Sequence, residues 1–282
     1  EASSIVPSAT TIFQEGIVIP PTKLIDRGAE RHDITELYLS NVRYRDALNG
    51  DLRAQLGACG VARKGLIELC EQYGRDEVIR YSDGLMDYAD QRATEEFKKI
   101  PDGIYEGETW TDTDGNGAID IPIRAKITKK GADIHVYYSG GPPSTGSFNA
   151  TYAVMMATST IPFLYYIDPD IPQNHGVLKH ISADAAENTI CLAKWPAATA
   201  GATTNPADPM HDVINIAMAD AIPDLVPAGG AKTSHLPNFN GVDSRTGEVW
   251  GCLLFNSGGG SGAAKGSDGW PMFCTIAGMG GL

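Results

Sequence analysis

The segment with the clearest chemical potential runs from Asp168 to Gly176, with the sequence DPDIPQNHG. It contains two carboxylates, an amide and an imidazole. Carboxylates and histidine can act as acid and base, or can supply oxygen and nitrogen ligands to a metal. Two prolines stiffen the segment, because proline fixes φ and disfavours helical geometry in the residue before it. Asp168, Asp170 and His175 are therefore candidate catalytic residues. The alternative is that the carboxylates cap backbone amides while the histidine is solvated.

A second candidate is the glycine-rich run from Ser257 to Gly266. Gly258, Gly259 and Gly260 carry no side chain, so their backbone amides can approach a ligand closely, and they are candidate substrate-binding residues. The run has no Gly-Lys-Ser/Thr ending and no G-x-G-x-x-G in a strand-to-helix setting, so a nucleotide loop is not supported. The alternative is a flexible or closely packed loop.

Other metal and nucleophile motifs are weak. Residues 112–120 supply oxygen ligands at the positions of a calcium loop, but Ile123 stands where a bidentate glutamate is needed. A turn-rich β-hairpin connection is the better interpretation. The sequence contains no HExxH and no GxSxG motif. The five cysteines form no CxxC pair, and we predict that they are reduced. No metal ligand is assigned to this chain.

Bulk composition excludes several partner classes. The chain has 282 residues, 42% of them hydrophobic, and a net charge of −13, which argues against nucleic acid and anionic membrane surfaces. The uncharged run from Phe148 to Ile167 contains several polar residues and has no basic flank, so we expect a buried helix rather than a membrane span. The first residues, EASSIVPSATTIF, do not resemble a signal peptide, and we expect a cytoplasmic protein.

The periodicity of apolar residues predicts three successive segments. Residues 1–45 form an irregular, extended arm, and residues 46–100 form a helical hairpin, with apolar positions three or four apart. Gly57, Gly60 and Gly65 predict a break in its first helix, and Gly74 is placed to cap that helix. Residues 101–282 form a mixed α+β core that ends in the glycine-rich loop.

Within that core the pattern predicts an antiparallel β-meander, a buried central helix and further mixed strands, in an α+β fold. The predicted strands are 105–110, 119–127, 134–138, 177–182, 189–193 and 248–255, and the predicted helices are 148–167 and 209–222. The apolar side of the last helix is predicted to consist of Val213, Ile214, Ile216, Ala217 and Ala221.

Several motifs, taken together and in order, resemble the B-type subunit of the hydantoinase/oxoprolinase family. They are Gln14-Glu15-Gly16, Ile19-Pro20-Pro21, Asn41-Val42-Arg43, GDLRAQ at 50–55, Pro101-Asp102-Gly103 before Tyr105-Glu106, Phe148-Asn149-Ala150-Thr151, Asp168-Pro169-Asp170-Ile171-Pro172 with Asn174 and Gly176, the helix at Asp212, and Gly258-Gly259-Gly260 with Asp268-Gly269. The resemblance covers nearly the whole chain.

The resemblance implies a cytoplasmic, multi-subunit enzyme. In this family an A-type subunit uses ATP and magnesium to phosphorylate a cyclic amide or a ketone enol. The B-type subunit then completes hydrolysis or carboxylation, and a metal-bound water can attack the activated carbon. We predict part of the B subunit of an ATP-dependent hydrolase of cyclic amides such as hydantoins, 5-oxoproline or lactams. One alternative is a subunit of a ketone carboxylase of the acetone or acetophenone type, and another is a non-catalytic scaffold.

One departure limits what the resemblance can assign. The family's metal-binding segments, rich in histidine and aspartate, lie before the point at which this chain begins, so a divalent metal is expected in that part and not here. The expected partners are an A-type ATP-binding subunit, the remaining part of the B subunit, and a small cyclic amide or ketone. The chain is expected to be the central portion of a larger subunit.

Overall fold

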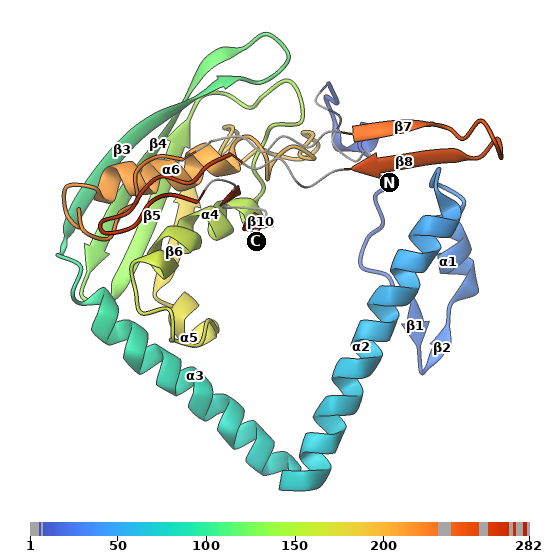
Figure 1. Ribbon diagram of the computed structural model, residues 1–282, viewed down its shortest axis with the longest axis horizontal. Helices are drawn as coiled ribbons and strands as arrows, with labels where there is room; N and C mark the ends of the chain where they lie inside the picture. Colours follow the sequence, from blue (N-terminus) through green and yellow to red (C-terminus); the bar gives the residue numbers. More distant parts are fainter. Residues whose placement is uncertain are drawn as a thin grey trace. The chain divides into compact units, whose positions relative to one another are not determined.

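The computed structural model describes residues 6, 8–230, 238–253, 259–270, 273–274 and 279–280 (Figure 1). The chain divides into two compact units, which are described separately. The first comprises residues 16–84 and 238–253 of the described chain, and the second comprises most of residues 5–15, 85–237 and 254–282. Helices and mainly antiparallel strands occur in both, which confirms the predicted α+β class.

The first unit is mainly helical. Its elements are β1 (Ile25–Asp26), β2 (Ala29–Glu30), α1 (His32–Leu39), α2 (Arg45–Tyr73), the start of α3 (Arg75–Phe97), and the hairpin of β7 (Asn238–Val242) and β8 (Val249–Leu253). Arg53 of α2 donates two hydrogen bonds of 2.6 Å to the Glu30 carboxylate, which joins α2 to β2. The prediction of irregular structure throughout residues 1–45 is wrong for α1.

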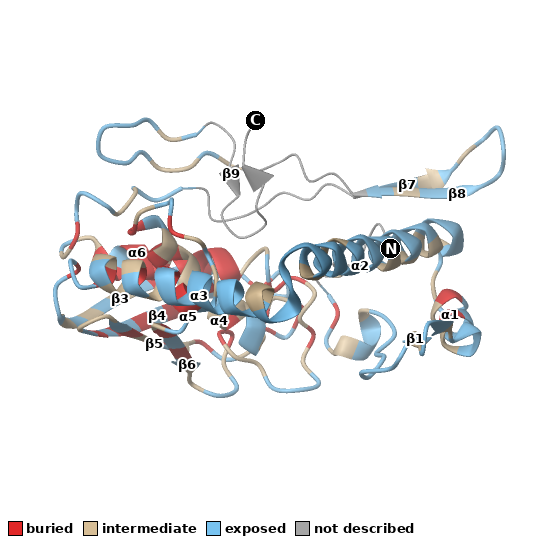
Figure 2. Cartoon of the chain, turned by 90° about the horizontal axis from the view of Figure 1, so that it is seen from below, coloured by how far each residue is buried: buried red, intermediate tan, exposed pale blue. Residues whose placement is uncertain are grey.

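Helix α2 runs unbroken through Gly57, Gly60 and Gly65, so the predicted break is absent. Each glycine costs about 1 kcal/mol relative to alanine, but the intervening Ala, Leu, Arg and Glu residues favour the helix. Gly74 caps α2 with a φ of 87°, as predicted. No residue of α2 is buried (Figure 2). Packing of α2 and α3 as a hairpin stays a prediction.

The second unit is built on a four-stranded sheet in the order β3-β4-β5-β6. Strands β3 (Gly103–Thr113), β4 (Ile119–Lys130) and β5 (Asp133–Gly140) form the predicted antiparallel meander. Strand β6 (Ile181–Ala185) pairs parallel to β5. Alternate residues of β4 are buried from Ile121 to Lys129, while Arg124 and Lys126 on the other face pair with Glu108 and Glu106 of β3. One face is therefore covered and the other is exposed.

Two helices cover the buried face. Helix α4 (Tyr152–Tyr165) is the predicted buried helix, and α6 (Ala207–Met218) contacts α4, β3 and β4 (Figure 1). Thr151 caps α4 by accepting a hydrogen bond from the Val154 amide. Buried side chains concentrate in these elements (Figure 2). Across the described part of the chain, no helix is both long and apolar enough to cross a membrane.

The remaining elements are short. They are a 3-10 helix (Ile12–Gln14), α5 (His175–Leu178), and the paired strands β9 (Phe273–Cys274) and β10 (Met279–Gly280). The strand predicted at 177–182 begins instead at Ile181, after α5, and residues 189–193 contain an isolated bridge between Thr189 and Leu192 rather than a strand. The turn at 112–120 joins β3 to β4 as the predicted hairpin, and Asp114 accepts amide hydrogen bonds from Asn116 and Ala118.

Candidate functional site

A pocket of about 370 Å³ lies within the second unit, beside α6. Its walls are the C-terminal end of α4, one face of α6, residues 225–230 and residues 260–270. We name it the α6 pocket. A cavity of this size is within the range that small-molecule sites occupy, and its described lining combines apolar and aromatic side chains with a few polar groups, as such sites do.

Helix α6 supplies the polar side of the pocket. Asp208, His211, Asp212 and Asn215 all line it, and their spacing of three and four residues places them on one helical face. The opposite face carries the apolar residues Met210, Val213, Ile214 and Ala217, all of which are buried. This division of α6 into two faces directs its polar residues away from the sheet. The predicted apolar residue Ile216 is instead 44% exposed.

Close contact with the sheet sets the position of α6. Gly107 of β3 leaves room for the helix, because a Cβ atom at that position would lie 2.6 Å from the Val213 carbonyl oxygen. Tyr138 of β5 donates a hydrogen bond of 3.1 Å to the Met210 carbonyl oxygen. The Tyr166 hydroxyl donates to the Asn215 side chain. These contacts fix the helix and therefore fix where its polar face lies.

Asp208 is buried and lies in the first turn of α6. A helix N-terminus favours a charged carboxylate. Burial nevertheless raises the pKa of Asp208 to about 7, and the nearby Asp212 adds to the rise. Near neutral pH this carboxyl is therefore present in both protonation states, so it can donate or accept a proton.

His211 is buried beside Asp208 on the same face. Burial lowers the pKa of its imidazole to about 4, against the opposing influence of Asp212, so the ring is neutral at pH 7. Its Nε2 atom is buried and has no hydrogen-bond partner within the described chain. The ring packs edge-on against Tyr165, with centroids 5.9 Å apart. A buried polar atom without a partner is costly, and it indicates a position that a ligand can satisfy.

The opposite wall comes from two chain segments that lie in close contact. The Ala228 amide donates a hydrogen bond of 2.9 Å to the Ala263 carbonyl oxygen, and the Ser261 amide donates one of 2.9 Å to the Trp270 carbonyl oxygen. A Cβ atom at Gly262 would lie 1.7 Å from the Ala228 carbonyl oxygen, so glycine is required for this approach. The contact places Trp270 and Asp268 in the pocket wall.

The predicted catalytic residues lie elsewhere in the second unit. Asp168 pairs with Arg92 of α3 at 2.5 Å and accepts a hydrogen bond of 2.9 Å from the Asp170 amide. Asp170 and His175 are exposed. Asn174 caps α5 by accepting a hydrogen bond from the Gly176 amide, at 2.8 Å. The structure thus gives Asp168 a pairing role, while catalytic roles for these three residues stay predictions.

Of the three glycines predicted to bind substrate, one lines the α6 pocket. Gly260 lines the α6 pocket, and Gly259 lies directly before it but is not a lining residue. Gly258 lies outside the described residues. Close packing of this segment, which the sequence offered as an alternative, is seen at Gly262. Binding of substrate by these glycines stays a prediction.

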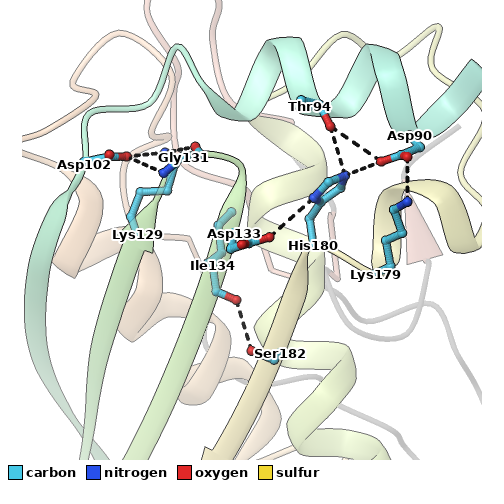
Figure 3. Close-up of polar contacts among 10 residues, drawn as sticks. All are labelled: Asp90, Thr94, Asp102, Lys129, Gly131, Asp133, Ile134, Lys179, His180 and Ser182. Carbon is cyan, nitrogen blue, oxygen red and sulfur yellow. Dashed lines mark hydrogen bonds and ion pairs between the residues drawn. The ribbon is translucent and has the colours of Figure 1, made fainter.

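A second polar cluster joins α3 to the sheet (Figure 3). Asp90 accepts from Lys179 at 2.5 Å and lies 2.7 Å from the Nε2 atom of His180. The hydrogen bond from Lys179 contributes most to a lowered pKa of Asp90. Near the same end, the buried Lys129 ammonium pairs with Asp102 at 3.0 Å. The charges of this cluster are paired with one another, which suits a structural role.

Among the described residues, no group of three or more His, Cys, Asp or Glu side chains is arranged to hold a metal ion. The divalent metal that the resemblance implies for another part of the subunit stays a prediction.

Sequence reasoning missed Asp208 and His211. The available signal was the polar stripe that Asp208, His211, Asp212 and Asn215 make in an otherwise apolar helix. That stripe has a helical period, but the sequence does not show that a loop some fifty residues later folds over it.

Comparison with known proteins places the chain in a family. The model of the hydantoinase B/oxoprolinase family matches residues 1–280. The chain belongs to this family. The resemblance that the sequence motifs predicted is thereby confirmed.

Individual relatives include hydrolase and carboxylase subunits. The chain is 34% identical over 269 residues to the caprolactamase subunit beta of Pseudomonas jessenii, covering 94% of this chain and 46% of that protein. It is 26% identical to the acetophenone carboxylase delta subunit of Aromatoleum aromaticum, covering 76% of this chain and 32% of that protein. The crystal structure of the ATP-dependent caprolactamase from Pseudomonas jessenii matches with a TM-score of 0.85 and 31% identity, over 95% of this chain and 47% of that one.

These coverages show that the chain spans less than half the length of the relatives it matches. Both curated relatives are subunits of larger enzymes. The fold and family therefore follow from the comparisons, whereas the activity, substrate and partners of the whole protein are matters for a proposal.

Proposed function

We propose that this chain is part of the B subunit of an ATP-dependent hydrolase of cyclic amides. The observation that supports the proposal most is its 34% identity to caprolactamase subunit beta over 94% of the chain. The fold of the ATP-dependent caprolactamase, matched at a TM-score of 0.85, agrees with it. In the proposed reaction an A-type partner phosphorylates the amide oxygen with ATP and magnesium, and the B subunit completes ring opening in the cytoplasm.

The α6 pocket is our candidate for the contribution of this chain. Its size suits a small cyclic amide. Opening an amide ring requires a proton for the departing nitrogen. Asp208, with a pKa of about 7, can hold such a proton at neutral pH, and the neutral His211 ring can accept a hydrogen bond. Leu225 and Trp270 provide apolar surface for the methylene groups of a ring.

The test is an assay of the intact complex with caprolactam, hydantoin and 5-oxoproline, each with and without ATP and magnesium. We expect ring-opened product that depends on ATP, accompanied by stoichiometric release of phosphate. Failure on all cyclic amides, in a complex that contains its metal and both subunits, contradicts the proposal.

A ketone carboxylase subunit is the second candidate, supported by the 26% identity to the acetophenone carboxylase delta subunit. The same preparation distinguishes the two, because a carboxylase consumes acetone or acetophenone only when bicarbonate and ATP are present. A fully assembled complex that contains no metal and is inactive with both substrate classes indicates a scaffold subunit.

A further inference from the structure

Asp208 and His211 lie three residues apart on α6, and both line the α6 pocket. Each is only 7% exposed. We propose that these two side chains act as an acid and a base on the phosphorylated cyclic amide, and that the proton of Asp208 decides whether the C–N bond or the C–O bond to phosphate breaks. This assignment rests on the proposed function, because it requires a phosphorylated amide as the substrate of this pocket.

The choice between the two bonds arises once water has added to the phosphorylated carbon. That carbon then carries a hydroxyl group, the phosphoryl oxygen and the ring nitrogen. Phosphate is a weaker base than a deprotonated amine, so it is the better leaving group unless the nitrogen receives a proton. If the bond to phosphate breaks, the cyclic amide forms again with an oxygen from water, and ATP is consumed without ring opening. A proton donor at the nitrogen therefore couples ATP hydrolysis to ring opening.

The productive step balances with these two residues. Asp208 gives its proton to the ring nitrogen as the C–N bond breaks, and the electron pair of that bond stays on the nitrogen. The hydroxyl proton passes to the Nε2 atom of His211, and the electron pair that it leaves forms the C=O bond. The opened chain then carries an amine at one end and an acyl phosphate at the other, which a second water hydrolyses to carboxylate and phosphate.

His211 supplies the acceptor that this step requires. Its Nε2 atom is buried and has no hydrogen-bond partner within the described chain. In the tautomer that carries its proton on Nδ1, Nε2 accepts a hydrogen bond. Burial lowers the pKa of the imidazole to about 4, so the ring is neutral at pH 7 and its lone pair is available. The hydroxyl group of the adduct satisfies this costly buried atom.

Asp208 retains a proton that it can give. Burial, with a contribution from Asp212, raises the pKa of the Asp208 carboxyl to about 7. Protonated His211 is the stronger acid of the pair, so the proton that it receives can return to Asp208 after the step. Opposite pKa shifts in two groups of one site are typical of acid–base assignments in enzymes.

The experiment measures ring opening and phosphate release by the intact complex, with ATP, magnesium and caprolactam in water enriched in oxygen-18, at about pH 6.5. The parent should form amine and phosphate in equal amounts. Asp208→Asn should lower ring opening at least about 100-fold, because an amide side chain cannot transfer the proton. Its caprolactam-dependent phosphate release should continue, and the recovered caprolactam should gain oxygen-18.

Two further variants separate this role from a structural one. Both bond cleavages release the hydroxyl proton, so His211→Phe should slow phosphate release and ring opening together without changing their ratio. Asp224→Asn is the matched control and should behave as the parent, because Asp224 pairs with Lys265 and does not line the pocket. Circular dichroism and thermal unfolding show whether each variant is folded.

The pH dependence of the parent provides a test that needs no variant. Asp208 loses its proton as pH rises through about 7, so the phosphate released per amine should increase above that pH. The other titratable side chains that line the pocket beside this pair are Tyr165 of α4, Asp212 of α6 and Asp268 of the opposite wall. Burial raises the pKa of Tyr165 to about 12, so it stays protonated in this range. A constant ratio across neutral pH contradicts the role of Asp208.

Two results with a folded Asp208→Asn variant also overturn the inference: ring opening at the rate of the parent, or equal losses of ring opening and phosphate release. Either result leaves the proposed function standing, because the parent still opens the ring. A parent complex that contains its metal and both subunits but opens no cyclic amide removes the proposed function, and the assignment of Asp208 falls with it.

Discussion

The second unit has two places where aspartate and histidine occur together, and their surroundings differ. At the end of the sheet, His180 lies 2.7 Å from Asp90, which also accepts a hydrogen bond from Lys179, and the pKa of Asp90 is lowered (Figure 3). In the α6 pocket, the Nε2 atom of His211 has no partner within the described chain, and burial raises the pKa of Asp208 to about 7. In the first region the carboxylate is charged and paired. In the α6 pocket, burial favours the neutral forms of both the carboxyl and the imidazole.

This difference in pairing and burial distinguishes clusters that stabilise the fold from clusters that are candidate functional sites. Paired charges hold elements together, as Asp90 holds the helix α3 against the residues that lead into β6. Buried polar groups whose pairing is incomplete reduce the stability of a fold, and perturbed pKa values of this kind occur often at functional sites. The loop carrying Asp168 is of the first kind, because its carboxylate pairs with Arg92. The α6 pocket is of the second kind.

The largest expected loss of stability comes from a substitution that displaces α6 from the sheet. Gly107→Val should lower the free energy of unfolding by roughly 3 kcal/mol, because a Cβ atom 2.6 Å from the Val213 carbonyl oxygen forces α6 away from β3. Valine favours strands, so propensity cannot explain a loss. Urea unfolding measures it. Gly57→Ala in α2, where nothing lies within 4 Å, is the control and should raise stability slightly. If the Gly107→Val variant has the same free energy of unfolding as the parent, α6 does not pack closely against β3.

The pH dependence of stability tests the two pKa shifts. Asp208 has a raised pKa in the folded state, so its contribution is fully present below about pH 4 and is lost as pH rises through about 7. His211 has a lowered pKa, so its contribution is lost as pH falls from about 6.5 to about 4. The two effects oppose each other over nearly the same range, and the parent protein should show only a shallow net slope from this pair.

Single substitutions separate the contributions of Asp208 and His211 to the pH dependence of stability. Relative to the parent, Asp208→Asn should gain on the order of 2 kcal/mol of stability as pH rises from about 4.5 to about 7. Relative to the parent, His211→Phe should lose a similar amount of stability as pH rises from about 4 to about 6.5. Chemical denaturation at a series of pH values measures both. Difference curves that are flat would show that neither group is perturbed.

The next largest effect is expected from replacing one histidine in each of the two regions, His180 and His211. His180→Phe removes the contact with Asp90 and should cost roughly 1–2 kcal/mol. His211→Phe removes a buried nitrogen that has no partner in the described chain and retains the ring contact with Tyr165. At pH 7, where the parent imidazole is neutral, stability should therefore be unchanged or rise by up to about 1 kcal/mol. Thermal unfolding of the matched pair decides the comparison. Equal losses in both variants would mean that His211 is as well satisfied as His180.

The smallest effect concerns Lys129, whose buried ammonium pairs with the more exposed Asp102. Lys129→Met should change stability by less than about 1 kcal/mol, because the desolvation cost of the buried charge disappears with the charge, and Asp102 keeps water and the Gly131 amide as partners. Urea unfolding again provides the measurement. A large loss would show that this pair contributes much more than its geometry suggests.

Local patterns predicted much of the fold. Alternation of apolar residues identified the meander, and helical spacing identified α6, because side chains repeat every two residues in strands and every 3.6 in helices. The uncharged run from Phe148 to Ile167 identified the buried helix α4. The pattern failed at residues 1–45, where α1 forms, and at the glycines of α2, where neighbouring residues sustain the helix. It also placed Ile216 on the buried side of α6, although the sheet contacts the face with Val213 and Ala217.

The sequence by itself determined the family and the α+β class. These rest on motifs, composition and periodicity, which are local properties of the chain. Only the tertiary structure decided that Asp168 is held by Arg92, whereas Asp208 and His211 face a pocket closed by residues 260–270. The physical reason is that burial sets both protonation and pairing, and burial depends on segments distant in sequence that meet only in the folded protein.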